Sequence, residues 1–269
     1  MTNEKTTSVP TYVSLCSGYD GIGIGLKRAI PNLRTIAHCE IEAYAVANLI
    51  AKMEAGQLDA CPVFSDLKTF PYRELRNRVT ILSAGFPCQP FSSAGKRQAT
   101  EDPRHLYPWI ANGITAMRPR YVMLENVEGI ISAKTGDGES VLKYVLGDLE
   151  ERGYSCAWGI FSASEVGAPH QRKRVFILGY TSIERLCGGC EDEDGQQSEM
   201  LRARLGKTRY PARPSQQQYE WEEERTTQSC VGLPTNGTTF RVDELRLLGN
   251  GVVPDTCELA FNTLIQQLR

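Results

Sequence analysis

The segment from residue 11 to residue 180 alternates short apolar runs with helical patterns, and this alternation constrains the fold more than any other feature. The apolar runs predict strands at 11–16, 35–40, 78–85, 120–126, 155–161 and 174–180. Helical patterns fall between them at 43–53, 107–117 and 139–153. This order is typical of an α/β protein in which helices cover both faces of a parallel sheet. We therefore predict a doubly wound, mostly parallel sheet.

The composition changes abruptly after residue 180. Residues 181–238 contain few apolar side chains and polar runs such as EDEDGQQSE, so we expect a partly irregular excursion from the sheet. Near the end, Asp255 and Glu258 predict a capping box that starts a helix with one apolar face. The predicted organisation is a catalytic, cofactor-binding domain of residues 1–180 plus 239–269, with 181–238 as a separate region.

The totals exclude several classes of protein. No run approaches the ~20 apolar residues of a membrane span, and the first residues lack the pattern of a secretory signal, so we expect a cytoplasmic protein without a membrane partner. The nine cysteines form no repeating framework, and a single CxxC at Cys187 and Cys190 is a weak signal, so no metal is expected. The net charge of −2 means that nucleic acid would need a local basic surface.

A glycine-rich turn, CSGYDGIGIG, follows the first predicted strand. Glycines at a strand-to-helix turn let a nucleotide-like ligand approach the backbone, and Glu40 at the end of the second strand can accept the two hydroxyls of a ribose. A tight turn that only needs positive φ is the alternative.

A cysteine lies between two prolines in GFPCQPFSSAGKR, at the carboxyl end of the strand at 78–85. A thiol becomes a nucleophile as a thiolate, and nearby positive charge lowers its ordinary pKa of ~8.5. Arg172 and Arg174, in GAPHQRKRVFILG, and Glu125, in LENVEGI, come from other strand ends and are expected at the same edge of the sheet. A solvated basic turn and a helix cap or surface salt bridge are the alternatives for the arginines and the glutamate.

In this order, the segments LCSGYDGIG, GFPCQPFS, LENV, APHQRKRVFILG and LLGNGVVP strongly resemble the DNA cytosine-5 methyltransferase family. The resemblance implies a Rossmann-like fold and methyl transfer from S-adenosylmethionine to C5 of cytosine in DNA. In that mechanism the Cys88 thiolate attacks C6, Glu125 binds the N3 and N4 edge, and Arg172 and Arg174 hold the base and the nearby backbone. The target base must be flipped out of the duplex.

The resemblance also assigns contacts. Cofactor contacts are implied at Cys16, Gly18, Tyr19, Gly21, Glu40, Ile41, Asp66, Leu67, Pro87, Leu106, Asn250 and Val252. DNA contacts are implied at Gln89, Ser92, Lys96, Arg97, Arg104 and His170, with residues 92–105 as a closing lid. Double-stranded DNA is the expected partner, and a restriction endonuclease for the same site is a second partner that the sequence leaves open.

Three features depart from the family pattern. Cys16 stands where the family usually carries a phenylalanine that stacks on adenine, and His170 stands where glutamine is usual. Residues 181–235 are much shorter than the family's target-recognition domain, as we expect of a phage or prophage member, and hold seven basic against ten acidic residues. Two interpretations stay open: the stretch 202–214 follows a DNA backbone, with Tyr210 or Trp221 as wedges, or it is a linker.

Three alternative functions are compatible with parts of the sequence. The same chemistry can act on RNA, as in tRNA-methylating relatives. A non-catalytic binding module would not need to keep Cys88, Glu125, Arg172 and Arg174 together. A Rossmann oxidoreductase accounts for the glycine turn but leaves those four residues unexplained.

Overall fold

A computed structural model describes residues 9–87, 106–181 and 251–268, together with Tyr210, Gln217, Glu220 and Gly249. Cys88, Asn250 and the predicted lid at 92–105 therefore lie outside the described residues, as does most of 181–238. Within the described part of the chain, no helix is both long and apolar enough to cross a membrane.

Seven strands form one sheet in the order β3-β2-β1-β4-β5-β7-β6. Their bounds are β1 Thr11–Leu15, β2 Arg34–Cys39, β3 Val63–Phe64, β4 Ile81–Gly85, β5 Tyr121–Val127, β6 Ser155–Ser162 and β7 Lys173–Tyr180. Every pair is parallel except β5–β7 and β6–β7. This confirms the predicted Rossmann-like, mostly parallel α/β fold.

Two details of the sheet differ from the sequence-based expectation. β7 is antiparallel to both neighbours. The connection from β6 is only residues 163–172, with the short 3-10 helix η2 (Ala163–Val166) as its one regular element, and a parallel crossover takes about a dozen residues or more. β3 was not predicted, because its two residues are too few to show a strand pattern; it pairs with β2 at the sheet edge.

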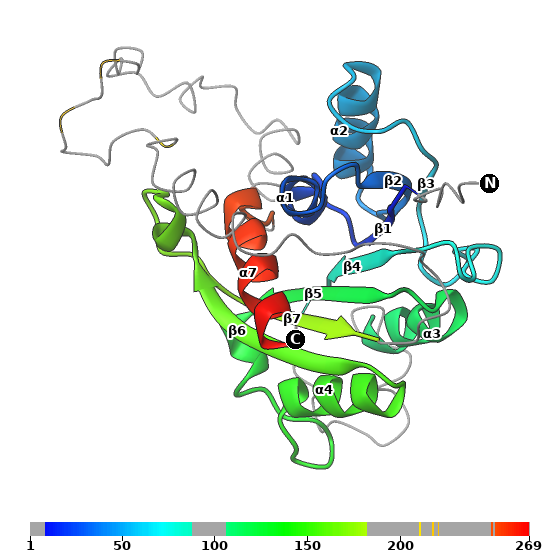
Figure 1. The fold of residues 1–269 in the computed structure, drawn as a ribbon, viewed down its shortest axis with the longest axis vertical. Helices are drawn as coiled ribbons and strands as arrows, with labels where there is room; N and C mark the ends of the chain where they lie inside the picture. Colours follow the sequence, from blue (N-terminus) through cyan, green and yellow to red (C-terminus); the bar gives the residue numbers. More distant parts are fainter. Residues whose placement is uncertain are drawn as a thin grey trace, which may run out of the picture.

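Helices cover both faces of the sheet (Figure 1). Their bounds are α1 Gly21–Ala29, α2 Ala43–Glu54, α3 Tyr107–Met117, α4 Val141–Glu151 and α7 Pro254–Gln267, with the short 3-10 helix η1 at Glu128–Ile130. One apolar cluster joins the sheet to α3 and α4, and a second joins its opposite face to α1 and α7. The C-terminal helix, far from α1 in sequence, therefore completes the same layer as α1 (Figure 1).

Strand alternation decides which side chains enter each layer. On β5, Val122 and Leu124 belong to the cluster under α3 and α4, whereas Met123 belongs to the cluster under α1 and α7. Because successive side chains alternate between the two faces of a sheet, Glu125 lies on the face of α1 and α7. The strand that builds the core thus also delivers a carboxyl group to its own carboxyl end.

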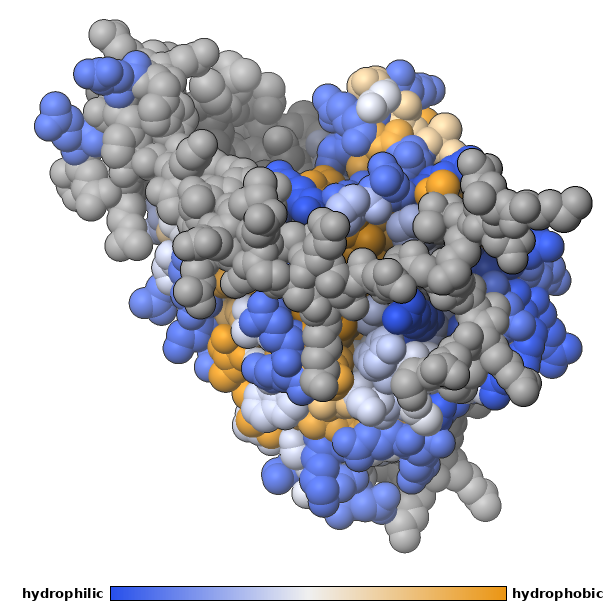
Figure 2. All heavy atoms as spheres, in the orientation of Figure 1, coloured by the Kyte–Doolittle hydropathy of each residue, from blue (hydrophilic) through white to orange (hydrophobic). Residues whose placement is uncertain are grey.

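α2 lies at the edge of this arrangement and buries only Ala45 and Leu49. Figure 2 shows apolar residues at the top, over α2, and a further apolar area lower down, over β6 and α7. Ile50 on this helix is 44% exposed. The helix therefore contributes less to the core than α1 or α7, and its first turn instead lies beside the cavity described below.

The predicted capping box of the C-terminal helix is wrong. Val253 is the N-cap and Pro254 the first helical residue, because proline with its fixed φ favours that position. Asp255 therefore falls inside the first turn and makes no cap. Its carboxylate instead binds Arg28 Nη1 of α1 at 2.9 Å and accepts a hydrogen bond from the Tyr210 hydroxyl at 2.9 Å.

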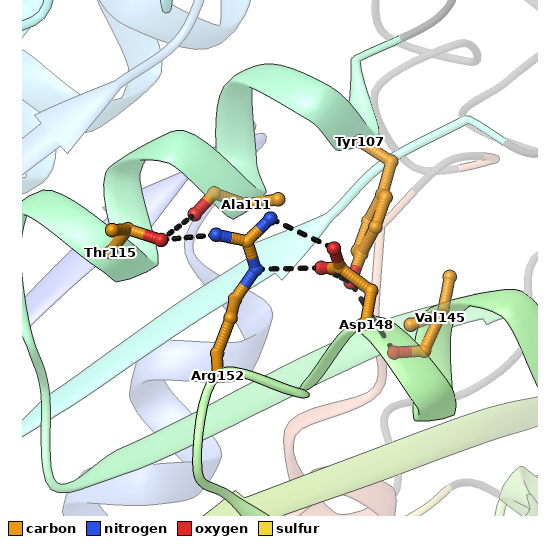
Figure 3. Close-up of polar contacts among 6 residues, drawn as sticks. All are labelled: Tyr107, Ala111, Thr115, Val145, Asp148 and Arg152. Carbon is orange, nitrogen blue, oxygen red and sulfur yellow. Dashed lines mark hydrogen bonds and ion pairs between the residues drawn. The ribbon is translucent and has the colours of Figure 1, made fainter. Parts of the chain in front are cut away.

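A polar cluster fastens α3 to α4 (Figure 3). The Tyr107 hydroxyl, in a side chain only 3% exposed, donates to Asp148 Oδ2 at 2.8 Å. The Arg152 guanidinium binds both oxygens of the same carboxylate at 2.8 Å and also reaches Thr115 Oγ1. Since Tyr107 begins α3, these bonds fix the first turn of α3 against α4.

We expect Asp148→Ala to lower the free energy of unfolding by about 1–2 kcal/mol, because it removes the charged acceptor of Tyr107 and Arg152. Urea denaturation measures the change. Lys143→Ala on the same helix is the control, since its ion pair with Glu139 is exposed and worth little. Equal effects of the two substitutions would contradict a structural role for the cluster.

Candidate active site

A cavity of about 500 Å³ opens at the carboxyl ends of β1, β2, β4 and β5. Open α/β sheets bind ligands at this edge. The predicted cofactor residues that lie within the described chain all line it: Cys16, Gly18, Tyr19, Gly21, Glu40, Ile41, Asp66, Leu67, Pro87, Leu106 and Val252. Glu125 and Arg174 line it as well. The structure therefore brings together residues from most of the length of the chain.

The glycine turn and Glu40 form one hydrogen-bonded unit. Glu40 Oε2 accepts the backbone N–H of Gly18 at 2.7 Å, and Oε1 accepts the N–H of Glu42 at 2.9 Å. Gly18 has φ +54, and no atom lies within 4 Å of the place where a Cβ would stand. The two amides fix the orientation of the carboxylate, and each oxygen keeps capacity for a further donor.

Cys16 lies partly exposed on the cavity wall in a left-handed conformation, with φ +51. Burial, followed by the nearby Glu40 carboxylate and Cys39, raises the pKa of its thiol well above the ordinary value. The group is therefore a neutral, apolar surface and not a nucleophile. Tyr44, at the start of α2, also lines the cavity and was not singled out from the sequence. It supplies an aromatic ring to the same cavity as Cys16.

Glu125 and Arg174 form an ion pair on this wall. Arg174 Nε lies 3.0 Å from Glu125 Oε1, and the side chains are 18% and 8% exposed. The antiparallel register pairs Val127 with Arg174, so the arginine lies two positions diagonally from Glu125 on the same face. Burial, opposed by Arg174 and then Arg172, raises the pKa of Glu125 to about 7.

Gly85 makes room for the Glu125 carboxylate. These residues are partners in the parallel β4–β5 register, and a Cβ on Gly85 would stand 3.2 Å from Glu125 Oε2. A side chain at the end of β4 would therefore crowd the second carboxylate oxygen. Glycine at this position, two residues before Pro87, leaves that oxygen free of crowding beside the cavity.

Asn126 is a buried residue that the sequence reasoning did not identify. Its side-chain amide donates to the Phe86 carbonyl at 2.9 Å, and its Oδ1 accepts the N–H of Val127 at 2.8 Å. β5 thus holds the backbone two residues before Cys88. In the sequence, only the position of Asn126 next to Glu125 in LENV points to it. Its contact with Phe86 depends on how β5 pairs with β4, which the sequence does not show.

Arg172 is described, but it does not line the cavity. Its Nη2 donates to the Gly249 carbonyl at 2.8 Å and to the Gly251 carbonyl. Arg172 has φ +32 and precedes β7, whereas Arg174 lies within the strand. The two predicted catalytic arginines are therefore separated: one pairs with Glu125, and the other binds the segment before α7.

The predicted DNA contacts mostly lie outside the described residues: Gln89, Ser92, Lys96, Arg97 and Arg104. His170 is described and exposed. Tyr210, considered as a wedge, is half-buried with its hydroxyl on Asp255, and Trp221 lies outside the described residues. Among residues 9–87, 106–181 and 251–268, no three His, Cys, Asp or Glu side chains are grouped as metal ligands, and Cys187 and Cys190 lie beyond these ranges.

Gly21 supports the cavity through a close backbone contact. A Cβ at this position would overlap the carbonyl of Val252. We expect Gly21→Ala to lower the free energy of unfolding by about 1–3 kcal/mol, because a backbone atom cannot move aside as a flexible side chain can. Thermal and urea denaturation give the change.

Gly147→Ala is the matched control, since Gly147 also lies in a helix and a Cβ there has nothing within 4 Å. It should be neutral, or stabilising by up to about 1 kcal/mol through helix propensity. If Gly21→Ala behaves in the same way, the contact with Val252 does not constrain α1.

Comparison with known proteins finds a matching family, similar sequences and a similar solved structure. A sequence model described as C-5 cytosine-specific DNA methylase matches residues 11–233. The type II methyltransferase M.NgoBV of Neisseria gonorrhoeae is 31% identical over 173 residues, which cover 62% of this chain and 40% of the relative. M.BanI of Aneurinibacillus aneurinilyticus is 34% identical over 174 residues, covering 62% and 38%.

A solved structure, the Dnmt2 methyltransferase of S. pombe, shares the fold with a TM-score of 0.53 at 22% identity, over 68% of this chain and 57% of that one. The chain thus spans less than half the length of the two sequence relatives described. The family match, in contrast, covers most of this chain, from β1 to beyond β7. The chain belongs to the C-5 cytosine-specific DNA methylase family.

Proposed function

We propose that this protein transfers a methyl group from S-adenosylmethionine to C5 of cytosine in DNA. One observation carries the proposal: a single cavity joins a glycine turn and fixed carboxylate, suited to a ribose, to a buried Glu125–Arg174 pair. The strand that leads to Cys88 ends at the same cavity. A cofactor site and a base-binding acid are thus adjacent, as methyl transfer between two bound molecules requires.

The cavity fits a nucleoside cofactor on three grounds. Glu40 is preset by two backbone amides, Gly18 leaves open space above the turn, and apolar side chains from Cys16, Ile41 and Leu67 line the wall. We assign the ribose hydroxyls to Glu40, and the adenine to the wall of Cys16, Ile41, Leu67 and Tyr44. When bound, S-adenosylmethionine supplies the methyl group on a sulfonium.

Cys88 is assigned as the nucleophile. Its thiolate adds to C6 of cytosine, which saturates the C5–C6 bond and places electron density on C5, where the methyl group is accepted. A base then removes the C5 proton, the double bond forms again, and the thiolate leaves. Pro87 lines the cavity and directly precedes Cys88 in the chain. Because the thiol cannot reach C6 in a stacked duplex, the base is flipped into the cavity.

Glu125 is assigned to the N3 and N4 edge of the base. Its raised pKa of about 7 keeps part of the group protonated near neutrality, so it can donate a hydrogen bond to N3 while electron density moves into the ring. Arg174 orients the carboxyl from the other side through the ion pair. A carboxyl that donates to N3 selects cytosine over thymine, whose N3 carries a proton.

The proposal extends to DNA recognition, to a partner enzyme and to the location in the cell. We assign target recognition to residues 181–238, together with the predicted contacts from Gln89 to Arg104 and at His170. M.NgoBV and M.BanI are named type II methyltransferases, so a restriction endonuclease for the same site is the partner to seek. A cytoplasmic location and no metal requirement complete the proposal.

The reaction is tested by incubating the protein with methyl-labelled S-adenosylmethionine and either duplex DNA or tRNA, and then mapping 5-methylcytosine. We expect transfer to DNA, abolished in Cys88→Ala, since the adduct cannot form without the thiol. Transfer to DNA that persists in Cys88→Ala would contradict the mechanism. Transfer to tRNA alone would contradict the substrate.

The pH dependence tests Glu125. The protonated fraction of a carboxyl with a pKa of about 7 falls as pH rises through that value, so the donor to N3 is lost on the alkaline side. Single-turnover rates should therefore decline above about pH 7 in the wild type. Glu125→Gln should be slower by about 100-fold or more, without that decline, because its amide donates at every pH. An unchanged alkaline decline in Glu125→Gln would assign the titration to another group.

A further inference from the structure

The segment that precedes α7 forms one wall of the cavity and is held from two sides. Gly251 and Val252 line the cavity together with Tyr19 of the glycine turn. On one side, the Tyr19 hydroxyl donates to the Val252 carbonyl. On the other side, Arg172 Nη2 donates to the carbonyls of Gly249 and Gly251. Among the described residues that line the cavity, Gly251 and Val252 are the only two that follow β7 in the chain.

The contact between this segment and the turn is close. A Cβ on Gly251 would overlap the ring of Tyr19, and a Cβ on Gly21 would overlap the Val252 carbonyl. Lys52 Nζ lies 5.0 Å from the centre of the Tyr19 ring and donates to the Tyr19 carbonyl at 3.0 Å. The turn is therefore fixed by α2 as well, and a small displacement of the segment away from the turn would widen the cavity.

Arg172 is suited to hold this segment. A guanidinium presents several N–H donors in one plane, so it can bind two carbonyls at once, and its hydrogen bonds are strengthened by its charge. Half-burial and the neighbouring Arg174 lower the pKa of Arg172, but an arginine stays charged at neutral pH. Its position before β7, with φ +32, removes it from the strand alternation that places Arg174 beside Glu125.

We propose that Arg172 is a positioning residue that clamps Gly249 and Gly251 against the glycine turn and so sets the affinity of the cavity for S-adenosylmethionine, while Arg174 serves the base. This inference rests on the proposed function, because it takes S-adenosylmethionine as the ligand. It separates two arginines that the family resemblance groups together. Loss of Arg172 weakens cofactor binding, and loss of Arg174 slows methyl transfer.

The test measures S-adenosylmethionine binding to the full chain by calorimetry, and single-turnover methyl transfer to DNA at saturating cofactor. Arg172→Ala should raise the Kd about tenfold or more, which corresponds to the loss of about 1.4 kcal/mol. The Kd of Arg172→Lys should lie between those of the wild type and Arg172→Ala, because one ammonium binds two carbonyls less well than a guanidinium does. Arg174→Gln should reduce the rate at saturating cofactor by a larger factor than it raises the Kd.

Lys173→Ala is the matched control, since its side chain is exposed between the two arginines. It should change neither quantity by more than about twofold. Tyr19→Phe removes the hydrogen bond to Val252 from the opposite side of the segment, so it should also raise the Kd. If Arg172→Ala does not fold, the Kd of Tyr19→Phe tests whether the contacts of this segment set cofactor affinity.

Three results would overturn the inference: an unchanged Kd in Arg172→Ala, an unchanged Kd in Tyr19→Phe, or a loss confined to the rate at saturating cofactor. Failure of the wild-type protein to bind S-adenosylmethionine is a different outcome. It would overturn the proposed function itself.

Discussion

The pairing of β5 with β4 on one side and β7 on the other decides which side chains meet at the carboxyl edge of the sheet. The parallel register places Gly85 opposite Glu125, and the antiparallel register brings Arg174 to the same face. A shift of one residue in either register would move these side chains to the opposite face. The site therefore depends on the same backbone hydrogen bonds that hold the core together.

A buried ion pair is a costly way to stabilise a fold, because desolvation of two charges offsets their attraction. Glu125 is 7% exposed, and its raised pKa shows that burial outweighs the nearby arginines. An apolar pair at this position would build an equally good core. The arrangement makes chemical sense as a carboxyl that changes its protonation state near neutral pH beside the cavity.

The sequence predicted the sheet and most strands, because apolar periodicity carries that information. Through the family resemblance of its motifs it also predicted many of the residues that line the cavity. It did not predict the antiparallel β7, the short β3 or the true start of α7 at Pro254. The roles of Asn126 and Arg172 were also hidden, since their partners, Phe86 and Gly251, are distant in sequence and become visible only through register and packing. Motif spacing places Arg172 beside Arg174, but backbone geometry directs them to different partners.

In the proposed reaction, the atom that receives the methyl group is C5 of cytosine. The most direct measurement uses duplex DNA that carries tritium at C5 of cytosine, incubated with unlabelled S-adenosylmethionine. Each methyl group that enters C5 displaces one hydrogen, so tritium should appear in water in equal amount to the methyl groups incorporated. Methyl incorporation without tritium release would show that another atom of the substrate is modified and would contradict the account.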